Sequence, residues 1–139
     1  MKVYIGNRNI DDQEYKKIID PKALSVIADD AECSSIVLDG VLHKYNSEEA
    51  VGTIKECLKK LRIGGNFIVA DVDFDLIVYL YSMNPDLASL NGMIANIGGI
   101  KSVFTFSLIK EIMESIPGLE LKLAQSANVE FRVEYVRKS

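Results

Sequence analysis

The chain of 139 residues has the length of a single domain with one hydrophobic core. Hydrophobic residues make up 48% of it and charged residues 26%, a balance that excludes intrinsic disorder of the chain as a whole. The formal net charge of -4 disfavours a nucleic-acid partner, because proteins that grip duplex DNA contact its phosphates with a surplus of Lys and Arg.

The first part of the chain predicts short buried strands that end at a glycine or at acidic residues. Apolar runs of this form lie at residues 3–5 before Gly6, at residues 18–19 before Asp20, and at residues 24–28 before Asp29 and Asp30. Residues 35–42 are almost continuously apolar, which is typical of a strand covered on both faces in a parallel sheet. A mainly parallel sheet is therefore expected.

Residues 47–62 carry the clearest helix signal. Ser47 is a good N-cap, acidic residues follow it in the first turn, and Gly64-Gly65 is the expected stop. The next apolar run, residues 66–71, predicts another strand. Residues 35–71 thus form a strand, helix and strand of the size that a right-handed crossover requires, which indicates an α/β domain.

The second half of the chain predicts helices and then a hairpin. Residues 73–97 have a helical pattern that is interrupted at residues 84–86 and ends at Gly98-Gly99, and a further helix opens at Thr105 or Ser107 and ends at residues 117–118. From residue 119 the apolar period changes to two, so residues 119–123 and 129–135 predict an antiparallel hairpin.

The few potential metal ligands argue against a metal site. Cys33 and Cys57 lack the spacing of a zinc knuckle and are expected to be reduced core thiols. His43 is the only histidine, which excludes sites that need two imidazoles. Asp71, Asp73 and Asp75 are spaced like a metal-binding run, but a strand end that becomes a helix cap explains them more simply. No metal is expected.

The sequence also predicts where the protein works. Its N-terminal residues have no apolar core of a signal peptide, and no stretch approaches the roughly 18 apolar residues of a membrane span. We therefore expect a cytoplasmic protein with no membrane partner.

Three segments resemble the class I methyltransferases that use S-adenosylmethionine. Residues 2–10 with Ile18-Ile19-Asp20 resemble the opening of short family members, and residues 36–45 look like the family's fourth strand and the loop after it. Residues 58–71, LKKLRIGGNFIVAD, are similar to the segment that leads into the fifth strand, and this is the strongest match. The resemblance implies a Rossmann-like sheet of seven strands, mostly parallel, with a C-terminal antiparallel hairpin, and S-adenosyl-L-methionine as cofactor.

The resemblance directs attention to the carboxyl ends of the strands, where open α/β sheets bind ligands. Gly6 would let the backbone approach the cofactor, and Arg8 would pair with the methionyl carboxylate. Asn7 stands where the family has a second glycine, so this sequence departs from the pattern there, but Asn7 is still expected to contact the cofactor. A simple turn at Gly6 and a surface role for Arg8 are the structural alternatives.

Acidic residues would hold the nucleoside part of the cofactor. Asp20 would accept hydrogen bonds from the ribose hydroxyls, although an Asp before Pro21 also forms turns. Asp29 or Asp30 would accept a hydrogen bond from the adenine amino group, with a solvated loop as the alternative.

The loop after the strand at residues 35–42 would face the methyl acceptor. A neutral His43 would remove a proton from a hydroxyl acceptor as a general base, unless it is a structural imidazole. Asp39 and Tyr45 are expected to line the same pocket, and Asp39 and Leu42 are expected to contact the cofactor. Asn84-Pro85-Asp86 lacks the aromatic residue of an amino-methylating motif, so methylation of DNA bases is disfavoured.

The interval from Gly6 to Asp20 is too short for a full crossover helix, so the fold is expected to be reduced in its N-terminal half. The leading hypothesis is a compact methyltransferase with an unidentified acceptor. A catalytically inactive methyltransferase-like module for binding or regulation is the alternative, and a third hypothesis, another adenine nucleotide as ligand, is weakened because no G-x-G-x-x-G string is present. A homodimer is expected, joined by an uncovered sheet face or by the apolar region 74–97.

Overall fold

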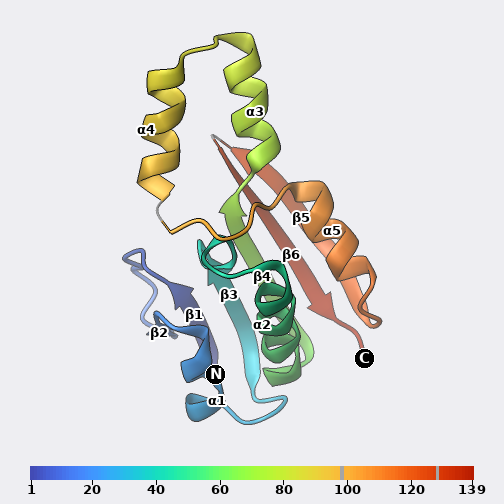
Figure 1. The fold of residues 1–139 in the computed structure, drawn as a ribbon. Coiled ribbons are helices and arrows are strands. Elements are labelled where there is room, and N and C mark those ends of the chain that lie inside the picture. The colour runs from blue at the N-terminus through green and yellow to red at the C-terminus, as the bar shows by residue number, and fades with distance from the viewer. Residues whose placement is uncertain (98, 128) are drawn as a thin grey trace.

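One mixed β-sheet organises the computed structural model, which describes residues 1–97, 99–127 and 129–139. Within these residues the sheet has six strands in the order β2-β1-β3-β4-β6-β5 (Figure 1). The strands are β1 (Lys2–Gly6), β2 (Tyr15–Ile18), β3 (Cys33–Asp39), β4 (Leu61–Val72), β5 (Leu119–Ala127) and β6 (Glu130–Arg137). Strands β1 to β4 are parallel, and β6 runs antiparallel to both of its neighbours, β4 and β5. This confirms the expected α/β class and the C-terminal hairpin.

The predicted strand at residues 24–28 is wrong. These residues belong instead to a short helical segment, the 3-10 turn η1 (Pro21–Ala23) followed by α1 (Leu24–Ile27). Asp20 begins it, because its Oδ1 accepts a hydrogen bond of 2.9 Å from the Lys22 amide while Pro21 occupies the first helical position. The sheet therefore has one strand fewer in the described residues than the expected seven.

The other helices begin close to their predicted residues. Helix α2 (Ser47–Lys60) is capped by Asn46 and not by Ser47, because Asn46 and Glu49 form a reciprocal capping box. It ends at Lys60, and Gly64-Gly65 lies inside β4. Thr105 caps α5 (Phe106–Glu114), so of the two predicted starts, Thr105 and Ser107, the first is confirmed. The predicted strand at residues 35–42 is shorter at its end, because β3 stops at Asp39. The short turn η2 (Leu42–Lys44) then connects β3 to α2.

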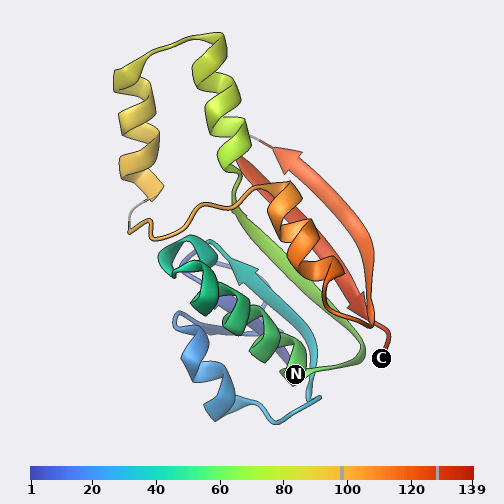
Figure 2. The ribbon, with the colours of Figure 1, turned by 45° about the vertical axis from the view of Figure 1, so that its right-hand side comes forward.

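The main core lies between one face of the sheet and helices α1, α2 and α5. Alternate residues of β1, β3, β4 and β6 point to this face and pack with Leu24, Ile54 and Met113 of the three helices. Figure 2 shows α2 and α5 running along the same face. The larger part of the buried apolar surface is therefore on one side of the sheet.

The opposite face has no helix in the described residues. Residues 7–14 contain none, which confirms the expected reduction of the N-terminal half. This face is nevertheless not left open, because Tyr4, Val37 and Ile68 are buried and Ile10 and Tyr15 pack against them. The expectation of an uncovered sheet face is therefore wrong.

Helices α3 (Phe74–Met83) and α4 (Leu87–Ile97) form a hairpin that stands beyond the sheet (Figures 1 and 2). The break between them confirms the predicted interruption, whereas Gly98 of the predicted stop lies outside the described residues. Only Ile77 of α3 is buried. No helix in the part of the chain described is long and apolar enough to cross a membrane.

Both cysteines are buried and unpaired, as predicted. Burial raises the pKa of Cys57 to about 12 and also raises that of Cys33. Because the thiolate is the reactive form, we expect no reaction with a disulfide reagent at about pH 8 until denaturant is added, after which both thiols should react. Fast labelling of either thiol in native buffer would contradict this burial.

Candidate functional site

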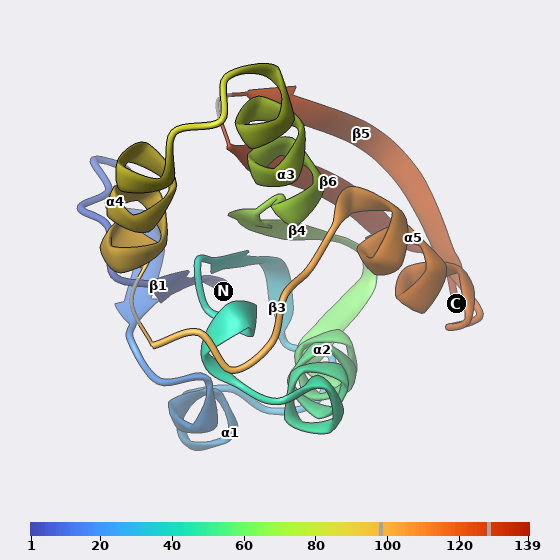
Figure 3. The ribbon, with the colours of Figure 1, turned by 45° about the horizontal axis from the view of Figure 1, so that its top comes forward.

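The four parallel strands end at one edge of the sheet, which Figure 3 brings toward the viewer. The chain turns sharply after β3 because Gly40 has a φ of +69°, a conformation that favours glycine. The Gly40 amide donates a hydrogen bond of 2.8 Å to the Ala70 carbonyl of β4, which fixes the turn. The segments after β1, β2 and β3 therefore meet at this edge.

A cavity of about 180 Å³ opens where these segments meet, and we call it the strand-end pocket. Its lining residues are Gly6, Asn7, Ile19, Asp20, Gly40, Val41, Lys44 and Tyr45. Three residues that the sequence nominates for the cofactor, Gly6, Asn7 and Asp20, are thus brought together, and Tyr45, expected at the acceptor, lines the same pocket. One oxygen of Asp20 caps η1, while the other makes no hydrogen bond within the described residues.

Gly6 is required by the packing of the sheet itself. A Cβ atom at this position would lie 2.7 Å from the Asp39 carbonyl oxygen and 3.0 Å from the Tyr4 hydroxyl. These atoms belong to the neighbouring backbone and to the face opposite the helices, so any side chain at residue 6 would disturb the sheet before it reached the pocket. A substitution at Gly6 would therefore confound ligand binding with stability.

Arg8 and Asp39 lie away from the strand-end pocket. Arg8 forms an ion pair with Glu130 of β6, and its Nε lies 3.7 Å from Asp39 Oδ2. Asp39 also accepts a hydrogen bond of 2.5 Å from the Tyr4 hydroxyl. Burial and this hydrogen bond raise the pKa of Tyr4 to about 12. Both nominated side chains are thus engaged on the helix-free side of the sheet.

Asp29 and Asp30 lie at the opposite edge, because residues 24–27 are helical and the chain has already crossed back before β3 begins. Asp30 accepts a hydrogen bond of 2.9 Å from Lys60 at the end of α2. This hydrogen bond lowers the pKa of Asp30. The structure therefore does not bring either residue to the strand-end pocket.

His43 is buried and faces Asp71, the residue near the end of β4. Its Nδ1 lies 2.7 Å from Asp71 Oδ1, and its backbone amide donates to Asp71 Oδ2 at 3.3 Å. Since a carboxylate only accepts, Nδ1 donates to Asp71, and in a neutral imidazole Nε2 would then present the lone pair. Nε2 is buried without a hydrogen-bond partner among the described residues. The contact with Asp71 therefore holds the imidazole ring in one orientation.

His43 and Leu42 do not line the strand-end pocket. Leu42 is fully buried in the main core. His43 lines a small apolar recess with Val72, Phe74 and Phe104. The 99–105 segment, between α4 and α5, closes over this recess: the amides of Lys101 and Ser102 donate to the His43 carbonyl at 2.8 and 3.3 Å. The Ser102 hydroxyl donates to the Tyr45 carbonyl at 2.6 Å.

Sequence reasoning missed the role of Asp71, whose signal is a charged residue at the end of a buried strand. It accepts a third hydrogen bond, of 2.7 Å, from the Val72 amide, and its side chain is fully buried. Asp73, in contrast, caps α3 by accepting from the Asp75 amide at 3.1 Å, as the simpler interpretation predicts. Within the described residues no cluster of three acidic, histidine or cysteine side chains could hold a metal.

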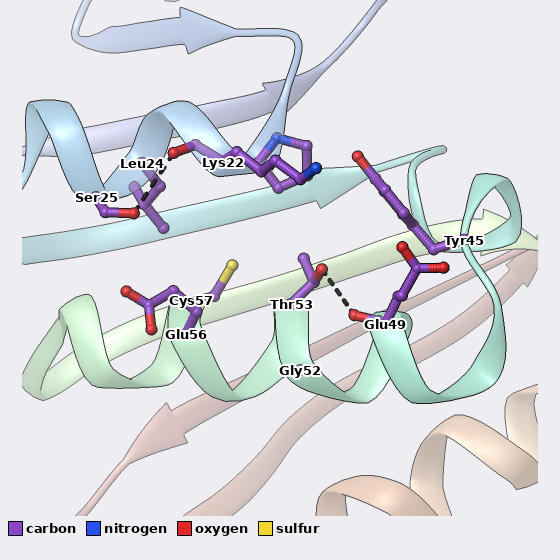
Figure 4. A pocket seen from close by; sticks show the side chains of 10 residues that line it. Lys22, Leu24, Ser25, Tyr45, Glu49, Gly52, Thr53, Glu56 and Cys57 are labelled. Atoms are coloured by element: carbon purple, nitrogen blue, oxygen red, sulfur yellow. Dashed lines mark hydrogen bonds between the residues drawn. The ribbon is translucent and has the colours of Figure 1, made fainter.

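A second cavity of about 320 Å³ lies between α1 and α2, and we call it the α1–α2 groove (Figure 4). Its lining residues are Pro21, Lys22, Leu24, Ser25, Tyr45, Glu49, Gly52, Thr53, Glu56 and Cys57. Tyr45 lines both this groove and the strand-end pocket.

No protein-family model matches the sequence, and no curated protein matches it. Solved structures match the fold over most of the chain. An O-methyltransferase family protein from Burkholderia thailandensis has a TM-score of 0.59 at 14% identity and covers 90% of this chain. A SAM-dependent methyltransferase from Archaeoglobus fulgidus has a TM-score of 0.59 at 9% identity and covers 88%. Magnesium protoporphyrin IX methyltransferase from Synechocystis, with bound SAH, has a TM-score of 0.57 at 16% identity and covers 89%.

The chain has the methyltransferase fold. This confirms the resemblance and the predicted fold class, whose hallmark here is the parallel sheet that ends in an antiparallel hairpin. The chain is short for this fold, since the matches cover only 36%, 67% and 51% of the Burkholderia, Archaeoglobus and Synechocystis chains respectively.

Proposed function

We propose that the protein binds S-adenosylmethionine in the strand-end pocket and transfers its methyl group to a small-molecule acceptor. The observation that carries this proposal is the meeting of Gly6, Asn7 and Asp20 in one cavity at the carboxyl edge of a methyltransferase sheet. A structural neighbour, the Synechocystis enzyme, holds SAH. Ligands in open α/β sheets bind at this edge.

The chemistry of the pocket residues fits the cofactor. The Asp20 carboxylate is suited to accept hydrogen bonds from ribose hydroxyls. Lys44 lines the pocket and makes no ion pair within the described residues, so it supplies the cation for the methionyl carboxylate in place of the engaged Arg8. Bound S-adenosylmethionine would supply an activated methyl group, and the protein would contribute mainly positioning.

In this proposal His43 acts on the acceptor. Asp71 holds the imidazole with Nε2 free to take a proton from a hydroxyl group. Because the 99–105 segment covers the recess at His43, an acceptor reaches Nε2 only when this segment moves.

Isothermal titration with S-adenosylmethionine and S-adenosylhomocysteine tests the proposal. We expect both to bind with one site per chain and ATP, the matched adenine nucleotide, to give no heat. Absence of binding by either adenosyl ligand would refute the proposal. Binding of ATP instead would favour a different adenine nucleotide.

The buried state of Nε2 favours a second candidate, a methyltransferase-like module that binds the cofactor without turnover. Incubation with methyl-labelled S-adenosylmethionine and a small-molecule extract separates the two candidates. An enzyme should transfer label, and His43→Asn should reduce transfer by about 100-fold or more while cofactor affinity stays unchanged. Binding with no label transfer by the wild type would favour the module.

We also expect a homodimer joined through the α3–α4 hairpin. Val78, Tyr79, Met83 and Leu87 are all more than half exposed. Residues 74–97 contain only two charged residues, Asp75 and Asp86, and no Lys or Arg, whereas membrane-surface helices carry basic residues. A second copy of the same apolar surface is therefore the better match.

Light scattering checks this expectation. The mass should rise toward twice 15.5 kDa with concentration, and Val78→Glu should restore the monomer. Val26→Glu is the matched control, since Val26 of α1 is 86% exposed and lies outside the hairpin. A mass that stays near 15.5 kDa at every concentration would contradict association.

A further inference from the structure

We propose that the face of the sheet opposite the helices carries a second binding site, for a small neutral heterocycle that has both an N–H donor and a carbonyl acceptor. The site is a cavity of about 260 Å³, lined by residues of β1, β2, β3 and β6 and of the segment 8–12, and we call it the face cavity. None of its lining residues lines the strand-end pocket. The proposal therefore goes beyond the proposed function and does not depend on it.

The segment that forms one wall of the face cavity is held at both ends. Arg8 forms an ion pair with Glu130 of β6. At the other end, Glu14 Oε2 lies 2.8 Å from Nζ of Lys2 on β1. These contacts hold the segment on the sheet through residues next to the cavity, so the space is present before any ligand enters. Small-molecule sites are usually largely pre-formed in this way.

The apolar part of the lining favours a flat ligand. Tyr4 and Val37, on neighbouring strands, are buried, and the half-buried Ile10 and Tyr15 pack against them. The Tyr15 ring is held in place, because its hydroxyl lies 2.9 Å from Ser35 Oγ, and an aromatic side chain offers a stacking surface to another ring. The volume lies just below the roughly 300–1,000 Å³ of typical small-molecule sites, which favours a ligand of one or two rings.

Asp39 provides an acceptor in the lining that the fold leaves without a donor. Its side chain is only 10% exposed. Oδ2 accepts the hydrogen bond of 2.5 Å from the Tyr4 hydroxyl, whereas Oδ1 is buried and has no partner among the described residues. A buried acceptor without a donor costs free energy, so a ligand N–H at this point would be bound favourably. The Arg8 Nε, 3.7 Å from Oδ2, already balances the charge of Asp39, so a neutral donor is sufficient.

Arg132 provides the complementary donor. It lies on β6, is exposed, and forms no ion pair within the described residues. A hydrogen bond from its guanidinium to a ligand carbonyl is charge-assisted and therefore among the stronger ones. A cyclic amide carries an N–H group directly beside a carbonyl, so a ligand of this class presents a group for Asp39 and a group for Arg132.

The charges of the lining favour a neutral ligand over an ion. Two arginines, Arg8 and Arg132, stand against two aspartates, Asp12 and Asp39. A small anion would gain the contact with Arg132 but meet two carboxylates, and a small cation would gain the carboxylates but meet two guanidinium groups. A neutral ligand with a donor and an acceptor avoids both repulsions.

Uracil tests the proposal, because it is a single flat ring with two N–H groups and two carbonyls. We expect one uracil to bind per chain in isothermal titration. The dimethylated form, 1,3-dimethyluracil, keeps the ring and both carbonyls without any N–H, and it should bind more weakly by about tenfold or more. Benzoate and benzylamine, aromatic ions of opposite sign, should also bind more weakly than uracil. Absence of uracil binding, or equal binding of any of these three compounds, would overturn the proposal.

Two variants test whether uracil lies in the face cavity. Arg132→Met removes the donor, and Asp39→Asn removes the unpartnered carboxylate oxygen but keeps an acceptor for the Tyr4 hydroxyl. Each should weaken uracil binding by about tenfold or more. Arg62→Met is the matched control, since Arg62 is an exposed arginine of the same sheet that does not line the cavity, and it should bind uracil as the wild type does.

Circular dichroism should show all three variants folded. Arg132 is exposed, so its replacement decides the outcome even if Asp39→Asn fails to fold. Wild-type affinity for uracil in a folded Arg132→Met would overturn the site. The proposed function would stand in that case, because it is tested with S-adenosylmethionine and S-adenosylhomocysteine.

Discussion

Replacement of Asp71 by alanine is expected to lower the free energy of unfolding by about 3–5 kcal/mol, since it removes the buried acceptor of three hydrogen bonds. The donors are the His43 ring, the His43 amide and the Val72 amide, and water does not reach the fully buried carboxylate to replace it. The same change frees the His43 ring from its fixed orientation. Urea denaturation monitored by circular dichroism measures the loss.

Asp11→Ala is the matched control, because Asp11 is exposed in the loop between β1 and β2. Its effect should stay within about 0.5 kcal/mol, the usual range for surface substitutions. If Asp71→Ala unfolded at the same urea concentration as Asp11→Ala, the buried contact between His43 and Asp71 would not exist in solution.

The second large effect concerns cofactor affinity. Asp20→Asn should weaken the binding of S-adenosylhomocysteine by about 10- to 150-fold, which corresponds to the loss of one charge-assisted hydrogen bond of about 1.5–3 kcal/mol. Asparagine keeps an oxygen that can accept from the Lys22 amide, so η1 should remain capped. Isothermal titration gives the affinity, and the thermal midpoint should stay within a few degrees of the wild type.

Asp29→Asn provides the comparison, since Asp29 lies at the opposite edge of the sheet. It should bind the ligand as tightly as the wild type. Equal affinities of Asp20→Asn and Asp29→Asn would remove Asp20 from the site, whereas a loss at Asp29 would contradict the observed path of the chain.

The sheet could be predicted from sequence wherever the pattern was long. Residues 119–123 and 129–135 alternate with period two and lie in the antiparallel strands β5 and β6. Residues 47–60 form α2, as the helical pattern predicts, although Asn46 and not Ser47 caps it. The strand predicted at residues 24–28 was wrong because a short apolar run fits a strand and a buried helix equally well. The deciding signal was present in Asp20-Pro21, since an acidic N-cap followed by proline is typical of a helix start.

The candidate site was predictable only in part, because its geometry depends on contacts between distant residues. Gly6 ends β1 and Asp20 follows β2, and the rule that ligands bind at the carboxyl ends of strands placed both correctly at one edge. The partners of Arg8 and His43, by contrast, are Glu130 and Asp71, and nothing local to either residue indicates those contacts. The wrong strand at residues 24–28 also explains the wrong prediction for Asp29 and Asp30. A strand there would have ended at the edge of the strand-end pocket, whereas the helix that is present brings the chain back to the opposite edge before Asp29.

The 99–105 segment lies between the α3–α4 hairpin and α5 (Figure 3) and is hydrogen-bonded to the chain at His43 and Tyr45. Its hydrogen bonds include those to the carbonyls of His43 and Tyr45, the first residue being the proposed general base and the second lining the strand-end pocket. We expect a shift of α4 to affect these two residues through this segment. If two chains associate through the hairpin, self-association and ligand binding share a coupling free energy that acts equally in both directions. The affinity for S-adenosylhomocysteine would then depend on protein concentration, and the dimer's dissociation constant on ligand.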